Sequence, residues 1–232
     1  MLILGIDTST PQVGCAIGGH EGVLASFQAA KGKRHAETLV PSIQFLCAQT
    51  GIELSEIGAV AVDVGPGLFT GLRVGVATAK AMASALRVPM VGVASLDLLA
   101  FEVRWTSRRI VSVVDARRGE VFYAFYRQVP GGVQRLSEMR CGSPEELCSE
   151  IQATGEEVLA LGDGALRYRD ALKDLLRVDV EDAGLAFPSP AALVQLAHAR
   201  ALREDFVNPW DLQPVYLRKA DAEVNWQTGP GR

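Results

Sequence analysis

The sequence predicts an α/β protein of two lobes, each built on a mixed sheet. Short apolar runs suited to buried strands alternate with segments whose apolar residues recur at helical spacing. Three predicted strands joined by tight turns open the chain, which is typical of an antiparallel meander. A strand that runs through a glycine loop into a helix occurs once in each half. These features indicate lobes at residues 1–104 and 105–220, and a polar tail at 221–232 that we expect to be disordered.

The first lobe is expected to have the order β-β-β-α-β-α-β. Its predicted strands are residues 2–6, 13–17, 23–29, 57–64 and 90–93, and its predicted helices are 36–49 and 71–86. Pro41 should kink the first helix or mark a late start, because proline removes a backbone donor. Thr70 is the expected N-cap of the second helix.

The second lobe is expected to repeat the plan of hairpins followed by alternating helices and strands, although the halves show no obvious sequence repeat. Its predicted strands are residues 110–114, 121–126 and 158–161, and its predicted helices are 144–153, 165–176 and 190–203. Residues 215–218 are expected to form a closing strand or a docking segment. The charged turn Asp115–Glu120 is either a solvated hairpin or a surface for a partner or tRNA.

Composition limits the function classes. The chain has 232 residues and a formal net charge of −4, whereas a protein that grips nucleic acid alone usually carries a basic excess. A nucleic-acid role is therefore expected to be indirect, or confined to a local patch such as Lys33, Arg34, Arg73 and Lys80. The four cysteines show no metal-ligand spacing and predict reduced thiols. No signal peptide or membrane-spanning run is recognised, which predicts a cytoplasmic protein without a membrane role.

Two turns are candidate phosphate-binding loops. Asp7, Thr8 and Ser9 follow the first strand, where backbone N–H groups and hydroxyls can cradle phosphate, or can simply form a local hairpin turn. Gly65 and Gly67 join a strand to a helix N-terminus, which suits an anion or a close backbone approach. The chain lacks the lysine-containing Walker A pattern.

Several motifs occur together in one order along most of the chain. They are Gly5-Ile6-Asp7-Thr8-Ser9-Thr10, His35-Ala36-Glu37, Gly65-Pro66-Gly67-Leu68-Phe69-Thr70-Gly71-Leu72-Arg73-Val74-Gly75, Asp115-Ala116-Arg117-Arg118-Gly119-Glu120-Val121, Gly162-Asp163-Gly164-Ala165 and Pro214-Val215-Tyr216-Leu217-Arg218. In this combination the chain resembles the TsaB (YeaZ) family, which is itself similar to TsaD. One departure is Leu68, where TsaB-like sequences usually have serine.

The resemblance implies an actin-like, sugar-kinase-like ATPase fold with ribonuclease H-like lobes. It also implies a non-catalytic protein that pairs with a TsaD-like catalytic subunit and a TsaE-like ATPase. That assembly transfers threonylcarbamoyl from its adenylate to the adenosine beside the anticodon of tRNAs that read ANN codons. The chain is then expected to have no cofactor of its own, to meet ATP, Mg²⁺ and tRNA only through the complex, and to form a homodimer when alone.

The resemblance favours the two first-lobe helices as the partner interface, since the second is rich in small residues. The candidate contact positions are Leu39, Ile43, Gly71, Leu72, Gly75, Val76, Ala79 and Ala83. Gly75→Arg is expected to abolish pairing and leave the fold intact. The alternative use of these small residues is packing of the helix on its own sheet.

Catalysis by the chain itself lacks sequence support. The TsaD relatives hold a metal with an H-x-x-x-H motif, and the matching positions here are Ser95 and Leu99, which cannot replace histidine ligands. His35 alone is expected to be a surface or capping residue. No metal site is therefore predicted. The alternatives kept open are an actin-like ATPase or small-molecule kinase using Asp7 and the glycine loops, and a peptidase.

Overall fold

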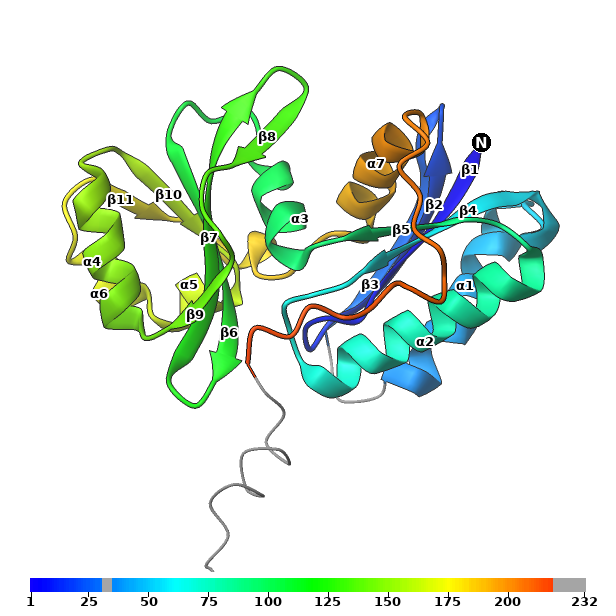
Figure 1. The fold of residues 1–232 in the computed structure, drawn as a ribbon, viewed down its shortest axis with the longest axis horizontal. Coiled ribbons are helices and arrows are strands. Elements are labelled where there is room, and N and C mark those ends of the chain that lie inside the picture. Colours follow the sequence, from blue (N-terminus) through cyan, green and yellow to red (C-terminus); the bar gives the residue numbers. More distant parts are fainter. Residues whose placement is uncertain (31–34, 219–232) are drawn as a thin grey trace, which may run out of the picture.

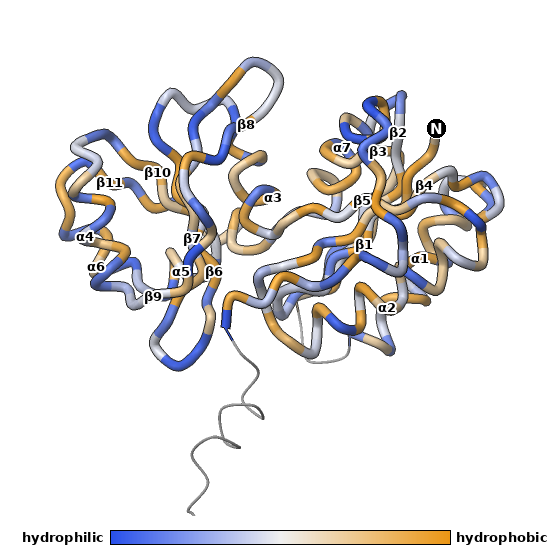
Figure 2. The backbone as a smooth tube through the Cα atoms, in the orientation of Figure 1, coloured by the Kyte–Doolittle hydropathy of each residue, from blue (hydrophilic) through white to orange (hydrophobic). Residues whose placement is uncertain are grey.

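The computed structural model describes residues 1–30 and 35–218 (Figure 1). The predicted patch residues Lys33 and Arg34 and the predicted polar tail at 221–232 lie outside these ranges. Two lobes stand side by side, each centred on one sheet, and Figure 2 shows that the central strands are largely apolar. The burial of these strands follows from their sequence, because uninterrupted runs such as Leu2–Ile6 suit strands covered on both faces.

The first sheet has five strands in the order β3-β2-β1-β4-β5. β1 pairs antiparallel with β2 and parallel with β4, β2 pairs antiparallel with β3, and β4 pairs parallel with β5. The bounds are β1 Leu2–Asp7, β2 Val13–Gly19, β3 Gly22–Ala29, β4 Ile57–Asp63 and β5 Met90–Val93. The predicted meander and the two following parallel strands are confirmed.

The second sheet repeats this topology in the order β8-β7-β6-β10-β11, with β9 as an additional partner of β7. β6 pairs antiparallel with β7 and parallel with β10, as β1 does with β2 and β4. The bounds are β6 Arg109–Arg117, β7 Glu120–Val129, β8 Gly132–Arg135, β9 Arg140–Gly142, β10 Val158–Leu161 and β11 Val178–Val180. The two-lobed actin-like α/β fold is therefore confirmed, and the lobes share the predicted plan without an obvious sequence repeat.

Helices cover both faces of the first sheet. α1 (His35–Thr50) and α2 (Phe69–Leu86) bury one face, and α7 (Pro190–Ala201) packs on the other against β1, β2 and β3. The predicted boundary at residue 104 is therefore wrong for α7, which lies late in the chain yet completes the first lobe. Its apolar face is needed there because Ile3, Ala16 and Ala59 would otherwise face water.

The second sheet is covered by α3 (Ser95–Glu102) on one face and by three short helices on the other. These are α4 (Pro144–Thr154), α5 (Asp163–Arg167) and α6 (Arg169–Lys173). Sequence analysis missed α3, and predicted one longer helix where α5 and α6 lie. The short 3₁₀ turns η1 (Leu54–Glu56) and η2 (Ala183–Leu185) complete the elements.

The segment after α7 returns along the first lobe to the second. Val207 forms a bridge to Met90, and the Val215 amide donates to the Val64 carbonyl at 2.7 Å. Arg218 then pairs with Glu120 of β7 at 2.8 Å. Residues 215–218 therefore dock as an irregular segment, and the alternative of a closing strand is wrong.

Two helix starts differ from the predictions. α1 begins at His35 and continues through Pro41, so a late start is wrong. α2 begins at Phe69 with Leu68 in the N-cap position, so Thr70 is already inside the helix. The cysteines at positions 15, 47, 141 and 148 are free thiols, as predicted. No helix within residues 1–30 and 35–218 is long and apolar enough to cross a membrane.

Candidate functional site

Two buried carboxylates stand at the ends of neighbouring parallel strands. Asp7 ends β1 and Asp63 ends β4, one residue beyond the paired Ile6 and Val62. Asp7 Oδ1 accepts from the Ser9 amide at 2.8 Å. Asp63 Oδ1 accepts from the Gly65 amide at 2.7 Å and the Ser95 hydroxyl at 2.6 Å. The Oδ2 atom of each carboxylate has no hydrogen-bond partner.

Burial sets the electrostatics of this pair. Loss of water raises the pKa of Asp7 well above its usual value, and the nearby charge of Asp63 raises it further. Burial also raises the pKa of Asp63 to about 6, although hydrogen bonds from Ser95 and Gly65 oppose the rise. The carboxylates therefore compete for charge, and burial favours the protonated form of both.

The predicted phosphate turn is packed directly against the start of α2. Thr8 Oγ1 donates to the Gly71 carbonyl at 2.7 Å, and the Leu68 amide donates to the Ser9 carbonyl at 2.6 Å. A Cβ added at Gly67 would lie 2.2 Å from Ser9 O, and one at Gly71 would lie 2.1 Å from Thr8 O. The glycines are thus required for close backbone approach. The Thr8 hydroxyl and the Ser9 carbonyl are bonded within the chain, whereas the Ser9 hydroxyl and Asp7 Oδ2 have no partner among the described residues.

Gly75 is subject to the same steric constraint, since it also lies against the turn. Its added Cβ would lie 2.4 Å from Thr8 Oγ1, so the larger side chain of Gly75→Arg would have to displace the turn. The expectation that this substitution spares the fold is therefore wrong. Gly65 adopts φ +97°, which restricts larger residues there as well.

The proposed partner-contact positions face inward. All eight are buried in this chain, and most belong to the core between the first sheet and its two helices. They pack on the sheet, so their nomination as surface contacts is wrong. The buried positions are Leu39, Ile43, Gly71, Leu72, Gly75, Val76, Ala79 and Ala83.

The outward faces of α1 and α2 carry the apolar side chains that sequence reasoning missed. Val40 is 47% exposed and Phe45 is 54% exposed, and both lie on α1. Ala77 and Ala81 are exposed on α2, where Val74 is half-buried. These five residues are called the α1–α2 face below. The sequence could have identified these residues as outward-facing, because their helical positions are out of phase with the buried residues of the same helices.

The residues at the positions considered for metal ligands have structural roles. His35 is buried, and its Nε2 lies 2.9 Å from the Thr10 carbonyl oxygen, so it anchors the turn and is not a surface residue. Ser95 donates to Asp63, and Leu99 is buried in the core under the second sheet. Across residues 1–30 and 35–218, no group of three or more His, Cys, Asp or Glu residues is arranged to hold a metal ion.

The charged turn of the second lobe is partly internal. Asp115 is buried and pairs with Arg117 at 2.8 Å and Arg167 at 3.2 Å. Its amide donates to Asp163 Oδ1 at 2.9 Å, and burial raises the pKa of Asp163 to about 6. The Asp115 end of the turn is therefore fixed by packing, while Arg117 and Arg118 remain exposed.

Comparison with known proteins decides the family. The family model for "TsaD: tRNA N6-adenosine threonylcarbamoyltransferase" matches residues 23–226. The chain is 29% identical to the tRNA threonylcarbamoyladenosine biosynthesis protein TsaB of Escherichia coli, over 100% of both chains. It is 28% identical to the Bacillus subtilis protein of that name, over 97% of this chain and 98% of the relative. The chain belongs to the TsaB (YeaZ) family.

A solved TsaB-family structure shares the fold throughout. The Pseudomonas aeruginosa protein described as similar to peptidase YeaZ superposes with a TM-score of 0.82 at 27% identity, covering 94% of this chain and 99% of that one. In this TsaB-family chain, Leu68 occupies the N-cap of α2 and makes no side-chain cap. Serine is a preferred N-cap residue, so the departure at Leu68 removes one potential cap and leaves the backbone contact with Ser9 intact.

Proposed function

We propose that this chain is a non-catalytic partner that binds and activates a TsaD-like subunit in threonylcarbamoyl transfer to tRNA. Relatives of full-length similarity are named tRNA threonylcarbamoyladenosine biosynthesis proteins. The observation that carries the partner role is the α1–α2 face, which exposes Val40 and Phe45 on a helix pair whose other side is fully packed. Large apolar side chains left exposed on a packed helix pair are typical of a protein interface.

The interior of the candidate phosphate site supports a non-catalytic role. Asp7, Thr8 and Ser9 are at most 1% exposed, and the turn hydrogen-bonds to α2. Phosphate binding at this turn would require the Thr8 hydroxyl to leave the Gly71 carbonyl and the buried turn to become accessible. Ser95 and Leu99 are likewise used in packing, where TsaD-like relatives are expected to hold a metal.

The partner surface suits a related helix pair. Ala77 and Ala81 are small and allow close helix approach, while Phe45 supplies a large aromatic anchor of the kind enriched in interfaces. We place the TsaD-like subunit on this face, with a second copy of this chain covering it when the partner is absent. A TsaE-like ATPase joins the pair, and ATP, Mg²⁺ and tRNA are met in the assembled complex.

The test compares two apolar-to-arginine substitutions. Phe45→Arg lies on the α1–α2 face, and Leu176→Arg, at a side chain 92% exposed in the second lobe, is its matched control. Each variant is mixed with the TsaD-like protein of the same organism and analysed by size-exclusion chromatography with light scattering. We expect the unchanged chain and Leu176→Arg to form a stable complex, and Phe45→Arg to lose it while keeping its circular dichroism spectrum.

Two results would overturn the proposal. Retention of the complex by Phe45→Arg at unchanged affinity would remove the assigned surface. Failure of the unchanged chain to form any complex, together with saturable ATP·Mg²⁺ binding by the isolated chain in calorimetry, would replace the partner role with an ATPase or kinase role.

A further inference from the structure

A row of cations runs along one side of α2. Arg73, Lys80 and Arg87 are spaced by seven residues, which is two helical turns with a drift of about 20°. The row spans 14 residues, or about 21 Å at about 1.5 Å per residue. Arg87 lies just past the helix in the left-handed conformation, at φ +56°, where glycine is the usual residue.

These three side chains differ from several other arginines of the described chain, which have carboxylate partners. Within residues 1–30 and 35–218, Arg109, Arg140 and Arg218 are paired with glutamates at 2.5 to 2.8 Å. No ion pair to Arg73, Lys80 or Arg87 occurs in the same ranges. An unneutralised row of positive charge is unusual in a chain of net charge −4, and it points to an anionic ligand.

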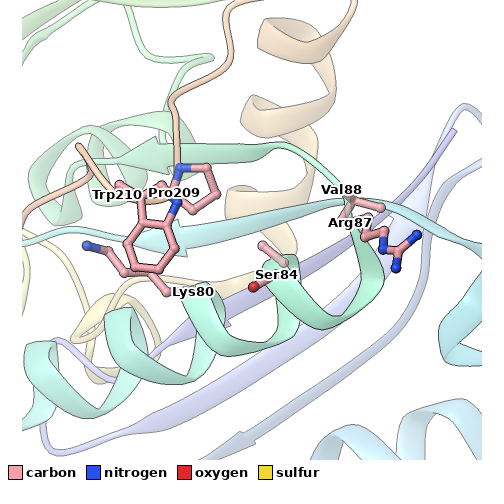
Figure 3. Close-up of a pocket in the computed structure, with 7 residues that line it drawn as sticks. Lys80, Ser84, Arg87, Val88, Pro209 and Trp210 are labelled. Carbon is pink, nitrogen blue, oxygen red and sulfur yellow. The ribbon is translucent and has the colours of Figure 1, made fainter.

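Aromatic rings accompany the cations. The Arg73 guanidinium lies 4.0 Å from the centre of the Phe69 ring, which contacts the Tyr216 ring at 5.2 Å between centroids. Trp210 is 80% exposed beside Lys80, as Figure 3 shows. These aromatics come from two segments, the start of α2 and the segment after α7, that the fold brings to one side of the first lobe.

A pocket opens between α2 and the segment that carries Trp210. Its volume is about 210 Å³, and Figure 3 shows Trp210 and Pro209 above the helix with Lys80 and Arg87 at opposite ends. The Ala83, Ser84 and Val88 side chains complete the lining. A planar apolar wall between two cations matches the chemistry of a nucleotide, whose base stacks while its phosphates pair with the cations.

We propose that this α2 row is a contact site for an RNA strand, with one unpaired base stacked on Trp210 and the backbone phosphates on Arg73, Lys80 and Arg87. A row of 21 Å matches about six phosphates of a stacked strand at about 3.4 Å per nucleotide, which is longer than a mononucleotide needs. Asp211 follows Trp210 in the sequence, and its negative charge opposes the binding of phosphates. Binding is therefore weak, and the contacts between cations and phosphates make it salt-dependent. The inference rests on the proposed function for the presence of RNA.

The site is separate from the partner surface on the same helix. Ala77 and Ala81 lie between the cation row and α1, so the partner and the RNA would occupy adjacent sides of α2. A chain placed in this way would hold RNA next to the catalytic subunit. This explains how an acidic protein can contribute to RNA binding through a local patch.

The test measures binding of a fluorescein-labelled, single-stranded 12-nucleotide RNA by anisotropy, using the complex with the TsaD-like subunit and the chain alone. Lys80→Glu with Arg87→Glu is compared with Arg203→Glu, an exposed arginine outside the row. Trp210→Ala is compared with Trp105→Ala, whose indole is 76% exposed and lies over Arg104. Competition with ATP distinguishes a site for an RNA strand from a site for a free nucleotide.

We expect the double charge reversal to weaken RNA binding at least tenfold and to reduce the slope of log affinity against log salt by about 2. We expect Trp210→Ala to weaken it about tenfold, and both controls to stay within twofold. Equal binding by the Lys80 and Arg87 variants and the unchanged chain would overturn the site. Displacement of the RNA by equimolar ATP would reassign it to free nucleotides.

The two proposals fail in different ways. Loss of RNA binding in variants that still form the complex supports the RNA site. A complex that forms normally, but whose RNA affinity is unchanged by the Lys80, Arg87 and Trp210 substitutions, would refute only the RNA site. Absence of any complex would refute the proposed function, while binding by the isolated chain would still test the cation row.

Discussion

Asp7 and Asp63 join the ends of β1 and β4 to the elements that follow them. The Gly65 amide and the Ser95 hydroxyl both donate to Asp63 Oδ1. This carboxylate oxygen therefore links the loop before α2 to the start of α3. Each carboxylate nevertheless leaves one buried oxygen unpartnered. Two buried negative charges on adjacent strands repel, and a proton retained by the pair relieves that repulsion.

Stability should therefore depend on pH through this pair. The folded pKa of both groups is raised above the unfolded value of 3.8, so each contributes stability that is lost as pH rises. For Asp63 this stability is fully present below the unfolded pKa and is lost as pH rises through about 6. For Asp63 alone the loss is up to about 3 kcal/mol, since each pKa unit corresponds to about 1.4 kcal/mol. Asp63→Asn should flatten this part of the profile in urea unfolding measured from pH 4 to 8.

The asparagine oxygen can still accept from Ser95 and Gly65, and its amide group can donate toward Asp7, so the fold should persist. Glu21→Gln, at an exposed turn, is the control and should leave the profile unchanged. A profile as steep for Asp63→Asn as for the unchanged chain would mean that the pair does not titrate in this range.

Sequence reasoning found the turns at Asp7 and Gly65 because turn chemistry is local. It selected the wrong side of α1 and α2, because helical spacing of apolar residues identifies a face that is buried without saying what buries it. Leu39 and Ile43 are buried by the sheet of their own lobe. Phe45 was recognisable only as a large apolar side chain out of phase with them. The Thr8 contact that fixes Gly75 is 67 residues away in sequence and could not be inferred.

At the scale of elements, α7 shows why chain order misplaces a domain boundary. Its helical pattern was predicted from the sequence, as was its approximate extent. The sheet on which α7 packs was not predicted, because an apolar helix face fits either sheet. Which sheet it covers depends on the path of the chain through η2. The repeat of hairpins followed by alternating helices and strands was predicted, but the strand order within each sheet was not, since that order also depends on the path of the chain.

Leu193→Ala should therefore destabilise the first lobe. Leu193 is fully buried against the first sheet, so the cavity should cost about 2 to 5 kcal/mol. Hydrogen exchange followed by mass spectrometry should show lost protection in β1 and β2 before β10 and β11. Leu202→Ala, at a side chain 72% exposed, should change stability by less than about 0.5 kcal/mol. Earlier exposure of β10 would place α7 functionally in the second lobe.

At the scale of the whole molecule, covered and uncovered surfaces are unevenly distributed. Both sheets are covered on both faces, and the segment after α7 ties the lobes together through Val64 and Glu120. Within residues 1–30 and 35–218, nothing covers the α1–α2 face in this way. If the α1–α2 face meets a related helix pair, as proposed, it can also meet its own copy, because a two-fold axis lets one patch contact itself.

Self-association through this face has a measurable thermodynamic consequence. If folded chains dimerise and unfolded chains do not, the thermal midpoint must rise with protein concentration by mass action. We expect such a rise between micromolar and hundred-micromolar concentrations for the unchanged chain and for Leu176→Arg. Phe45→Arg should give one midpoint at every concentration, equal to that of the unchanged chain when dilute, because its side chain is 54% exposed in the monomer. A concentration-dependent midpoint that survives in Phe45→Arg would locate the homodimer on another surface, and the shared use of the α1–α2 face by both partners would have to be abandoned.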